Sequence, residues 1–115
     1  MNIYEAYKEK TIDVNYETGY HFEIRYLSDH ELQWKALAKT AEGAPAVEKE
    51  PYSSYEISAG IYMVNWIEES GLVVSQVADF NLGKVYAFMT WPDGSARGNR
   101  AELLHKGTLT VLTTF

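Results

Sequence analysis

The feature that most constrains the fold of this chain is a period-two alternation of apolar and polar side chains. In residues 10–16, Ile12, Val14 and Tyr16 alternate with Asp13 and Asn15, which is the pattern of a β-strand that buries one face. Similar strands are predicted for residues 20–27, 31–39, 52–58, 61–68, 72–80, 84–91 and 101–112. The segment 31–39 is also compatible with a helix, because it is rich in good helix formers, but its alternation favours a strand. The last segment is one strand with a break at Gly107 or two short strands.

Glycine-containing turns separate most of these segments. Residues 17–19, 69–71 and 81–83 each end in a glycine, the residue that tolerates the positive φ of tight hairpin turns. Residues 41–51 break the pattern with Gly43, Pro45, Pro51 and four charged side chains, so we expect a surface loop there.

About eight antiparallel strands in 115 residues predict one all-β domain over residues 1–115. A meander of this length protects its edges by curling into a closed antiparallel up-and-down barrel. An eight-stranded barrel is just wide enough to be filled by side chains or to hold one small ligand. A β-sandwich is the alternative architecture.

Composition narrows the possible partners. Sixteen acidic and ten basic residues give a net charge of -6, which argues against nucleic acid as a partner. The absence of cysteine excludes disulfides and thiolate zinc sites, and the three histidines show no metal-ligand spacing. No apolar run approaches the roughly 18 residues of a membrane span and no signal peptide is apparent, so we expect a cytoplasmic protein without a membrane partner.

The segment 61–68 carries the clearest candidate for chemistry. Strand phase places Tyr62, Val64, Trp66 and Glu68 on one face, although the opposite face is also largely apolar. If the Tyr62 face lines the interior, burial among rings would raise the pKa of the Glu68 carboxyl and make it a general acid or base. Alternatively, the strand has already ended and Glu68 is a solvated turn residue.

Two motifs in the chain resemble a known family. The hairpin Tyr16-Glu17-Thr18-Gly19-Tyr20-His21-Phe22-Glu23-Ile24 and the strand Gly60-Ile61-Tyr62-Met63-Val64-Asn65-Trp66-Ile67-Glu68 are similar to those of the phenolic acid decarboxylases and their MoaF-like relatives. The resemblance extends from about residue 12 to residue 91. It implies a lipocalin-like (calycin) barrel that is cofactor-free and often dimeric.

The resemblance also assigns roles to individual residues. In the decarboxylases a glutamate, two tyrosines and an arginine form the site; Glu68 matches the glutamate and Tyr16 matches the second tyrosine. The position of the first tyrosine is Val14 here, and no arginine occurs between Leu27 and Tyr62. Because an arginine fork is the natural partner of a substrate carboxylate, these losses argue against decarboxylation of hydroxycinnamates and favour the MoaF-like branch. Arg97 and Arg100 are the loop arginines that could replace it, although loop arginines are more often solvated.

The aromatic side chains allow two interpretations. Besides Tyr16, the rings on the proposed inward phase include Tyr20, Phe22, Tyr26, Trp34, Tyr62 and Trp66. They form either a close-packed core or the wall of a small-ligand cavity.

We therefore expect a binding protein for a small apolar or aromatic ligand, with Tyr16 and Glu68 as polar contacts and no metal. A cofactor-free lyase or proton-transfer enzyme that uses Glu68 as its acid or base is the alternative. A third hypothesis is a partner or homodimer module that uses the face formed by Ile61, Met63 and Ile67.

Overall fold

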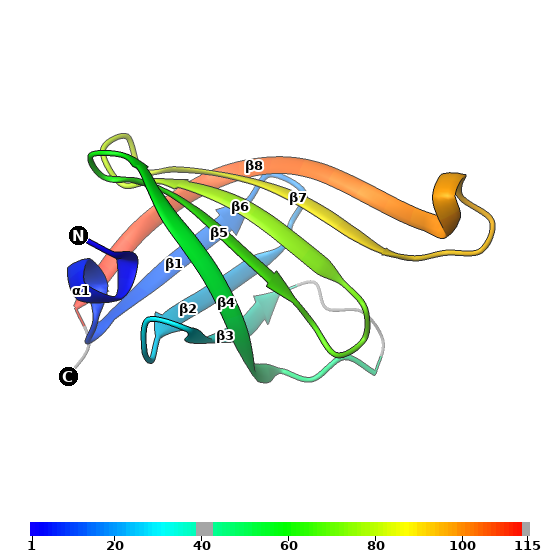
Figure 1. The fold of residues 1–115 in the computed structure, drawn as a ribbon, viewed down its shortest axis with the longest axis horizontal. Helices are drawn as coiled ribbons and strands as arrows, with labels where there is room; N and C mark the ends of the chain where they lie inside the picture. The colour runs from blue at the N-terminus through cyan, green and yellow to red at the C-terminus, as the bar shows by residue number, and fades with distance from the viewer. Residues whose placement is uncertain (39–42, 114–115) are drawn as a thin grey trace.

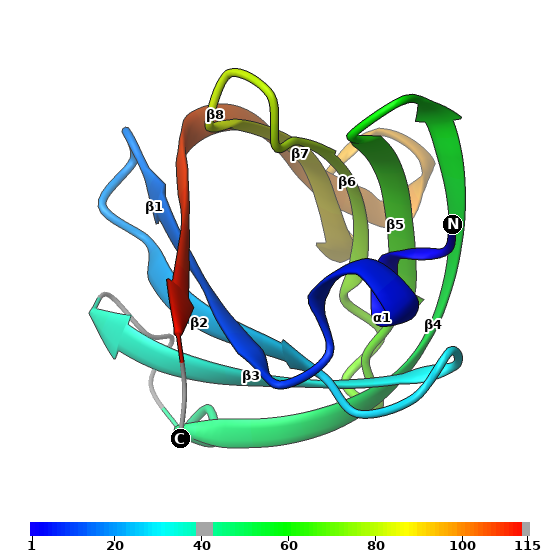
Figure 2. The same cartoon turned by 90° about the vertical axis from the view of Figure 1, so that its left-hand side faces the viewer.

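The computed structural model describes residues 1–38 and 43–113, which form a closed eight-stranded antiparallel barrel in the strand order β1-β2-β3-β4-β5-β6-β7-β8 (Figures 1 and 2). Its elements are α1 (Ile3–Tyr7), β1 (Lys10–Tyr16), β2 (His21–Tyr26), β3 (Glu31–Ala38), β4 (Val47–Ser58), β5 (Ile61–Ile67), β6 (Val73–Asp79), β7 (Lys84–Pro92), η1 (Arg97–Asn99) and β8 (Arg100–Thr113). The predicted all-β up-and-down barrel is confirmed, and the β-sandwich alternative is wrong. Lys39, the last residue of the predicted third strand, lies outside the described residues.

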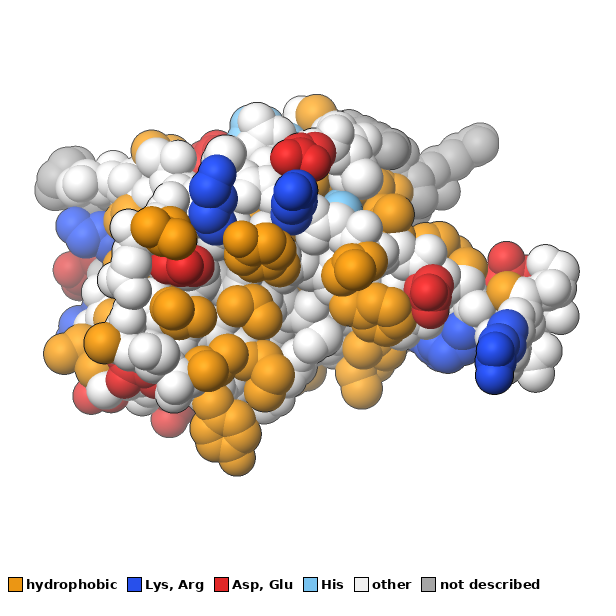
Figure 3. Space-filling view, turned by 90° about the horizontal axis from the view of Figure 1, so that it is seen from above, with side chains coloured by type: hydrophobic (Ala, Val, Ile, Leu, Met, Phe, Trp, Pro, Cys, Tyr) orange, Lys and Arg blue, Asp and Glu red, His pale blue; other side chains and the backbone are white. Residues whose placement is uncertain are grey.

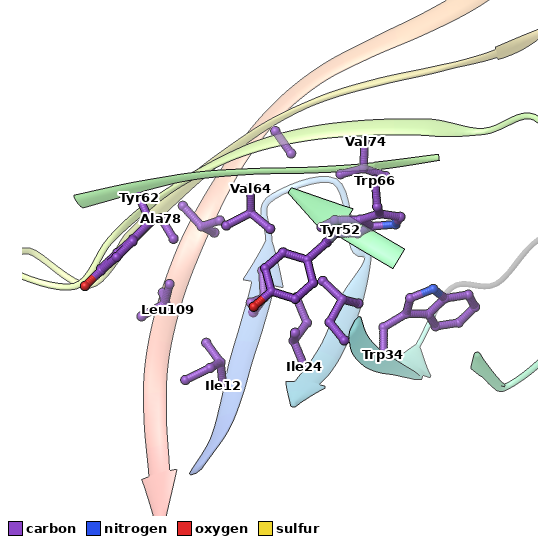
Figure 4. Close-up of a cluster of buried hydrophobic side chains, with 14 of the residues drawn as sticks. Ile12, Ile24, Trp34, Tyr52, Tyr62, Val64, Trp66, Val74, Ala78 and Leu109 are labelled. Carbon is purple, nitrogen blue, oxygen red and sulfur yellow. The ribbon is translucent and has the colours of Figure 1, made fainter. Parts of the chain in front are cut away.

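The interior is built from the alternation seen in the sequence. On β5, Tyr62, Val64 and Trp66 are buried, while Ile67 on the opposite phase is exposed. This settles which of the two apolar faces of the strand is internal. In Figure 4, Tyr62 lies at one end of the buried cluster, and Trp34 and Trp66 lie at the other end.

Closure depends on β8, which is one continuous strand. It pairs with β1 from Lys10↔Thr113 to Tyr16↔Gly107 and with β7 along its other edge. A Cβ atom built on Gly107 would lie 2.0 Å from the carbonyl oxygen of Asn15. The predicted break at Gly107 and the alternative of two short strands are therefore wrong, because β8 continues through Gly107. At this position two backbones approach so closely that a residue without a side chain is required.

The loop predicted for residues 41–51 is too long, because β4 already begins at Val47. Residues 47–51 pair with β3, whereas Tyr52 and the residues after it pair with β5. Pro51 stands where the pairing partner changes, so its missing N–H interrupts neither ladder. The charges that indicated a loop include Glu50, whose side chain is buried. Residues 41–42 of the predicted loop lie outside the described residues.

A short N-terminal helix, which the sequence analysis did not predict, lies at one opening of the barrel (Figure 2). Asn2 caps α1: its Oδ1 accepts from the backbone N–H of Glu5 at 2.7 Å, and Glu5 Oε1 accepts from the N–H of Asn2 at 3.2 Å. The ring of Tyr7 stacks on that of Phe80 with centroids 3.9 Å apart. At this end the Tyr62 hydroxyl donates to the Met1 carbonyl at 3.1 Å. Within the described residues, no helix is both long and apolar enough to cross a membrane.

Apolar side chains also gather on the outer surface, as the view over β5 to β8 shows (Figure 3). Tyr86 and Phe88 on β7 and Leu104 on β8 are all exposed. On β5, Ile67 is 65% exposed, whereas Ile61 and Met63 are half-buried. The predicted homodimer contact through these three β5 residues stays a prediction.

We predict that Gly107→Ala destabilises the barrel, because the new methyl group would force β8 away from Asn15. The free energy of unfolding should fall by about 1–3 kcal/mol or more, as expected for overpacking, which urea denaturation would measure. Gly94→Ala is the matched control, since a Cβ there has no neighbour within 4 Å. Equal stability of the two variants would contradict this account of closure.

Candidate functional site

The candidate site is a cavity of about 130 Å³ at the barrel end opposite α1. Residues from three of the connections at this end line the cavity: Tyr20 between β1 and β2, Ala44 and Pro45 before β4, and Glu68 and Leu72 between β5 and β6. Its walls are mostly aromatic and aliphatic, with few polar groups. The lining residues are Tyr16, Tyr20, Phe22, Ile24, Trp34, Ala36, Ala44, Pro45, Trp66, Glu68, Leu72, Val74, Gln76 and Met89.

Glu68 supplies the carboxyl group of the cavity. It is the first residue after β5, and its backbone N–H donates to the Leu72 carbonyl at 2.7 Å in the β5–β6 turn. Its Oε2 accepts from Trp66 Nε1 at 3.2 Å. Burial raises the pKa of Glu68 to about 7, the Trp66 hydrogen bond opposes this shift, and the nearby charges of Glu50 and Glu48 add to it. The strand does end at Ile67, yet the Glu68 side chain lines the cavity.

Glu50 forms a second carboxylate–tryptophan pair that the sequence analysis missed. Its side chain is 4% exposed, and its Oε2 accepts from Trp34 Nε1 at 3.0 Å. Burial raises the pKa of Glu50, against the Trp34 hydrogen bond, and Glu48 and Glu69 raise it further. Strand alternation could have predicted its burial, because Glu50 is two residues before the buried Tyr52 and lies on the same face of β4.

Tyr16 and Gln76 form the polar side of the cavity away from Glu68. Gln76 Nε2 donates to the Tyr16 hydroxyl at 3.0 Å, and both side chains are buried. Burial raises the pKa of Tyr16 to about 12, although the Gln76 hydrogen bond lowers it. The Tyr16 ring stacks on His105 at 3.8 Å, and His105 Nδ1 is hydrogen-bonded to Thr18 Oγ1 at 2.7 Å. Gln76 was also missed, although it shares its strand phase with Val74.

The structure divides the predicted ligand-binding residues between the two ends of the barrel. Tyr20, Trp34 and Trp66 line the cavity together with Tyr16 and Glu68. Tyr26 and Tyr62 do not. Tyr26 packs against the ring of Tyr52 at 5.4 Å, and Tyr62 packs edge-on to Tyr7 near α1.

The loop arginines do not complete an anion site in this cavity. Arg100 donates through Nε to Thr90 Oγ1 at 3.0 Å and through Nη2 to the Gly71 carbonyl at 2.7 Å. It therefore ties the β5–β6 turn to β7. Arg97 is exposed in η1, and neither arginine is a lining residue. Among the described residues, no group of three or more His, Cys, Asp or Glu side chains is placed to hold a metal ion.

Comparison with known proteins identifies the family. The profile of the MoaF-like family matches residues 8–103. The chain belongs to the MoaF-like family. The predicted resemblance is thus confirmed for this branch, and the match spans seven strands and the start of β8.

The fold of this chain is also found among solved structures. A "putative beta-lactamase from Burkholderia vietnamiensis" is similar with a TM-score of 0.73 and 21% sequence identity, over 91% of this chain and 94% of that chain. At this identity the likeness shows a shared fold. No curated protein matches the chain.

We predict that Glu68 makes stability depend on pH. A folded-state pKa of about 7 against a usual value of 4.5 means that the folded protein holds this proton more tightly than the unfolded chain does. The stabilisation of the folded state that comes from this tighter proton binding is fully present below pH 4.5 and is lost as the pH rises through about 7. Relative to Glu68→Gln, the wild type should lose on the order of 1–2 kcal/mol across this range, after allowance for solvent exposure of the side chain.

Urea denaturation of both proteins at a series of pH values would measure this difference. Glu69→Gln, which removes the adjacent exposed carboxylate, controls for the change in net charge. A stability difference between wild type and Glu68→Gln that stays constant with pH would rule out a buried, proton-holding Glu68.

Proposed function

We propose that this MoaF-like protein binds a small, apolar, single-ring aromatic ligand in the cavity between Tyr16 and Glu68. The observation that supports this is the cavity itself, about 130 Å³ of space at one end of a barrel whose other end is packed. A cavity of roughly 150 Å³ with apolar walls accepts a benzene ring. Aromatic walls with a few convergent polar groups are the usual composition of a small-molecule site.

The polar groups of the cavity suit a ligand with one polar substituent. The Tyr16 oxygen accepts from Gln76, so its own O–H is left to donate to a ligand. The Glu68 carboxyl accepts from Trp66 through one oxygen and has further acceptor capacity when ionised, or a proton to donate when neutral. A phenol, alcohol or amine on an aromatic ring would find partners here.

The geometry does not favour the decarboxylase reaction of the resembling family. Val14, at the position of the first catalytic tyrosine, is buried in the core with 1% exposure. Among the described residues that line the cavity, none is an arginine that could bind a substrate carboxylate. A ligand without a carboxylate fits the site better.

We predict that Ala36→Phe blocks binding, because Ala36 lines the cavity on β3 and a phenyl ring would occupy the space. Isothermal titration with 2-phenylethanol should show saturable binding to the wild type and binding weaker by roughly tenfold or more in the variant. Leu37→Phe is the matched control, since Leu37 is exposed on the same strand. Equal binding by all three proteins would place the ligand outside the cavity.

A second candidate function is proton transfer to an aromatic substrate with Glu68 as the acid or base. A carboxyl with a pKa of about 7 is poised for general acid–base catalysis at neutral pH. Here Tyr16 would orient the substrate from the opposite side of the same cavity.

Hydrogen–deuterium exchange at C3 of indole, followed by proton NMR in deuterated buffer, would test this activity. We expect the wild type to accelerate exchange above the rate in buffer and Glu68→Gln to abolish the acceleration, because the amide cannot transfer the proton. Exchange that proceeds equally in both proteins would remove Glu68 from any proton transfer.

A further inference from the structure

The cavity combines aromatic walls with the carboxyl group of Glu68 and, among the lining residues that the structure describes, contains no lysine or arginine. The charged side chains that act on the Glu68 carboxyl are Glu50 and Glu48, and both are acidic. Both lie on β4, whose pairing with β5 extends to Trp66, two residues before Glu68. The phenols of Tyr16 and Tyr20 are the other titratable groups in the lining. The described surroundings of Glu68 therefore present negative charge without a compensating cation.

Basic residues on the neighbouring strands point elsewhere. Lys35 on β3 and Lys49 on β4 are exposed and occupy the strand phase opposite to the buried Trp34 and Glu50. Arg100 is held by Thr90 and by the Gly71 carbonyl. Lys35 and Lys49 therefore face solvent and Arg100 binds β7 and the β5–β6 turn, whereas the Glu68 carboxyl accepts a hydrogen bond from the Trp66 indole.

Building on the proposed ligand-binding function, we propose that the cavity selects a small aromatic amine in its ammonium form over the corresponding alcohol or carboxylate. The ammonium group would pair with Glu68 while the ring enters the apolar part of the cavity. A buried charge is tolerated when it is paired and hydrogen-bonded. An ammonium would supply the positively charged partner that the Glu68 carboxylate lacks. The rings of Trp34 and Trp66 would add attraction where the cation lies over a ring face.

A carboxylate ligand would be repelled by the negative charge that attracts the ammonium. Its negative charge would enter a partly buried space already influenced by three glutamates, Glu48, Glu50 and Glu68. Like charges in a desolvated site repel strongly because the effective dielectric constant is low. The aromatic wall alone would not distinguish these ligands, since their rings are the same, so the selectivity rests on the carboxylates.

The test compares three probes with one skeleton: 2-phenylethylamine, 2-phenylethanol and 3-phenylpropionate. Isothermal titration at pH about 8, where Glu68 is ionised, should give binding of the amine at least about tenfold tighter than that of 3-phenylpropionate, with the alcohol between them. At pH about 5.5 the advantage of the amine over the alcohol should shrink, because the Glu68 carboxyl takes up a proton while the amine stays charged.

Glu68→Gln keeps the shape of the side chain but removes its charge, so the advantage of the amine over 2-phenylethanol should disappear. Glu69→Gln, a change at the adjacent exposed glutamate, should retain the selectivity. Binding of the alcohol without preference for the amine would overturn this inference and leave the proposed function intact. Failure of all three probes to bind wild type would overturn both, and equal amine selectivity in Glu68→Gln would place the cation away from Glu68.

Discussion

Pairing of β1 with β8 is the constraint on which the rest of the structure depends. Without it, the two outermost strands would each expose a row of unpaired backbone groups. The pairing runs without interruption from Lys10↔Thr113 to Tyr16↔Gly107, and its last step places Tyr16 beside the cavity. Closure also forces every strand to direct one face inward. Glu68, which follows β5 on the opposite wall of the barrel from β1, therefore lines the same cavity as Tyr16.

The two ends of the barrel differ in how their aromatic side chains are used. At the α1 end, Tyr7, Tyr62 and Phe80 pack on one another, and the helix contributes the buried Ile3. At the other end the rings surround a space instead of filling it. Both indole N–H groups of the described cavity lining are bound by carboxylates, Trp34 by Glu50 and Trp66 by Glu68. The same arrangement that satisfies the indoles therefore concentrates acidity at the open end.

The accuracy of the sequence predictions followed the strength of local signals. β1 was predicted with its exact bounds because alternation and a glycine turn agree there. The start of β4 was predicted too late, since Glu48, Lys49 and Glu50 have the composition of a loop. Their strand conformation depends on pairing with β3, which is a contact distant in sequence. α1 was missed because five residues are too few for a periodic signal, and its stability comes from the cap and from packing on the barrel.

The sequence by itself determined the strand alternation, the turns, the barrel and the family to which the chain belongs, because these follow from local patterns and short motifs. It also indicated Glu68 and Tyr16 as candidate site residues, and both line the cavity. Only the tertiary structure decided which face of β5 is internal, that Tyr26 and Tyr62 lie away from the cavity lining, that Gln76 lines the cavity, and that Glu50 is hydrogen-bonded to Trp34 of the lining. These outcomes depend on which side chains meet across a closed sheet, and strands far apart in the chain decide that together.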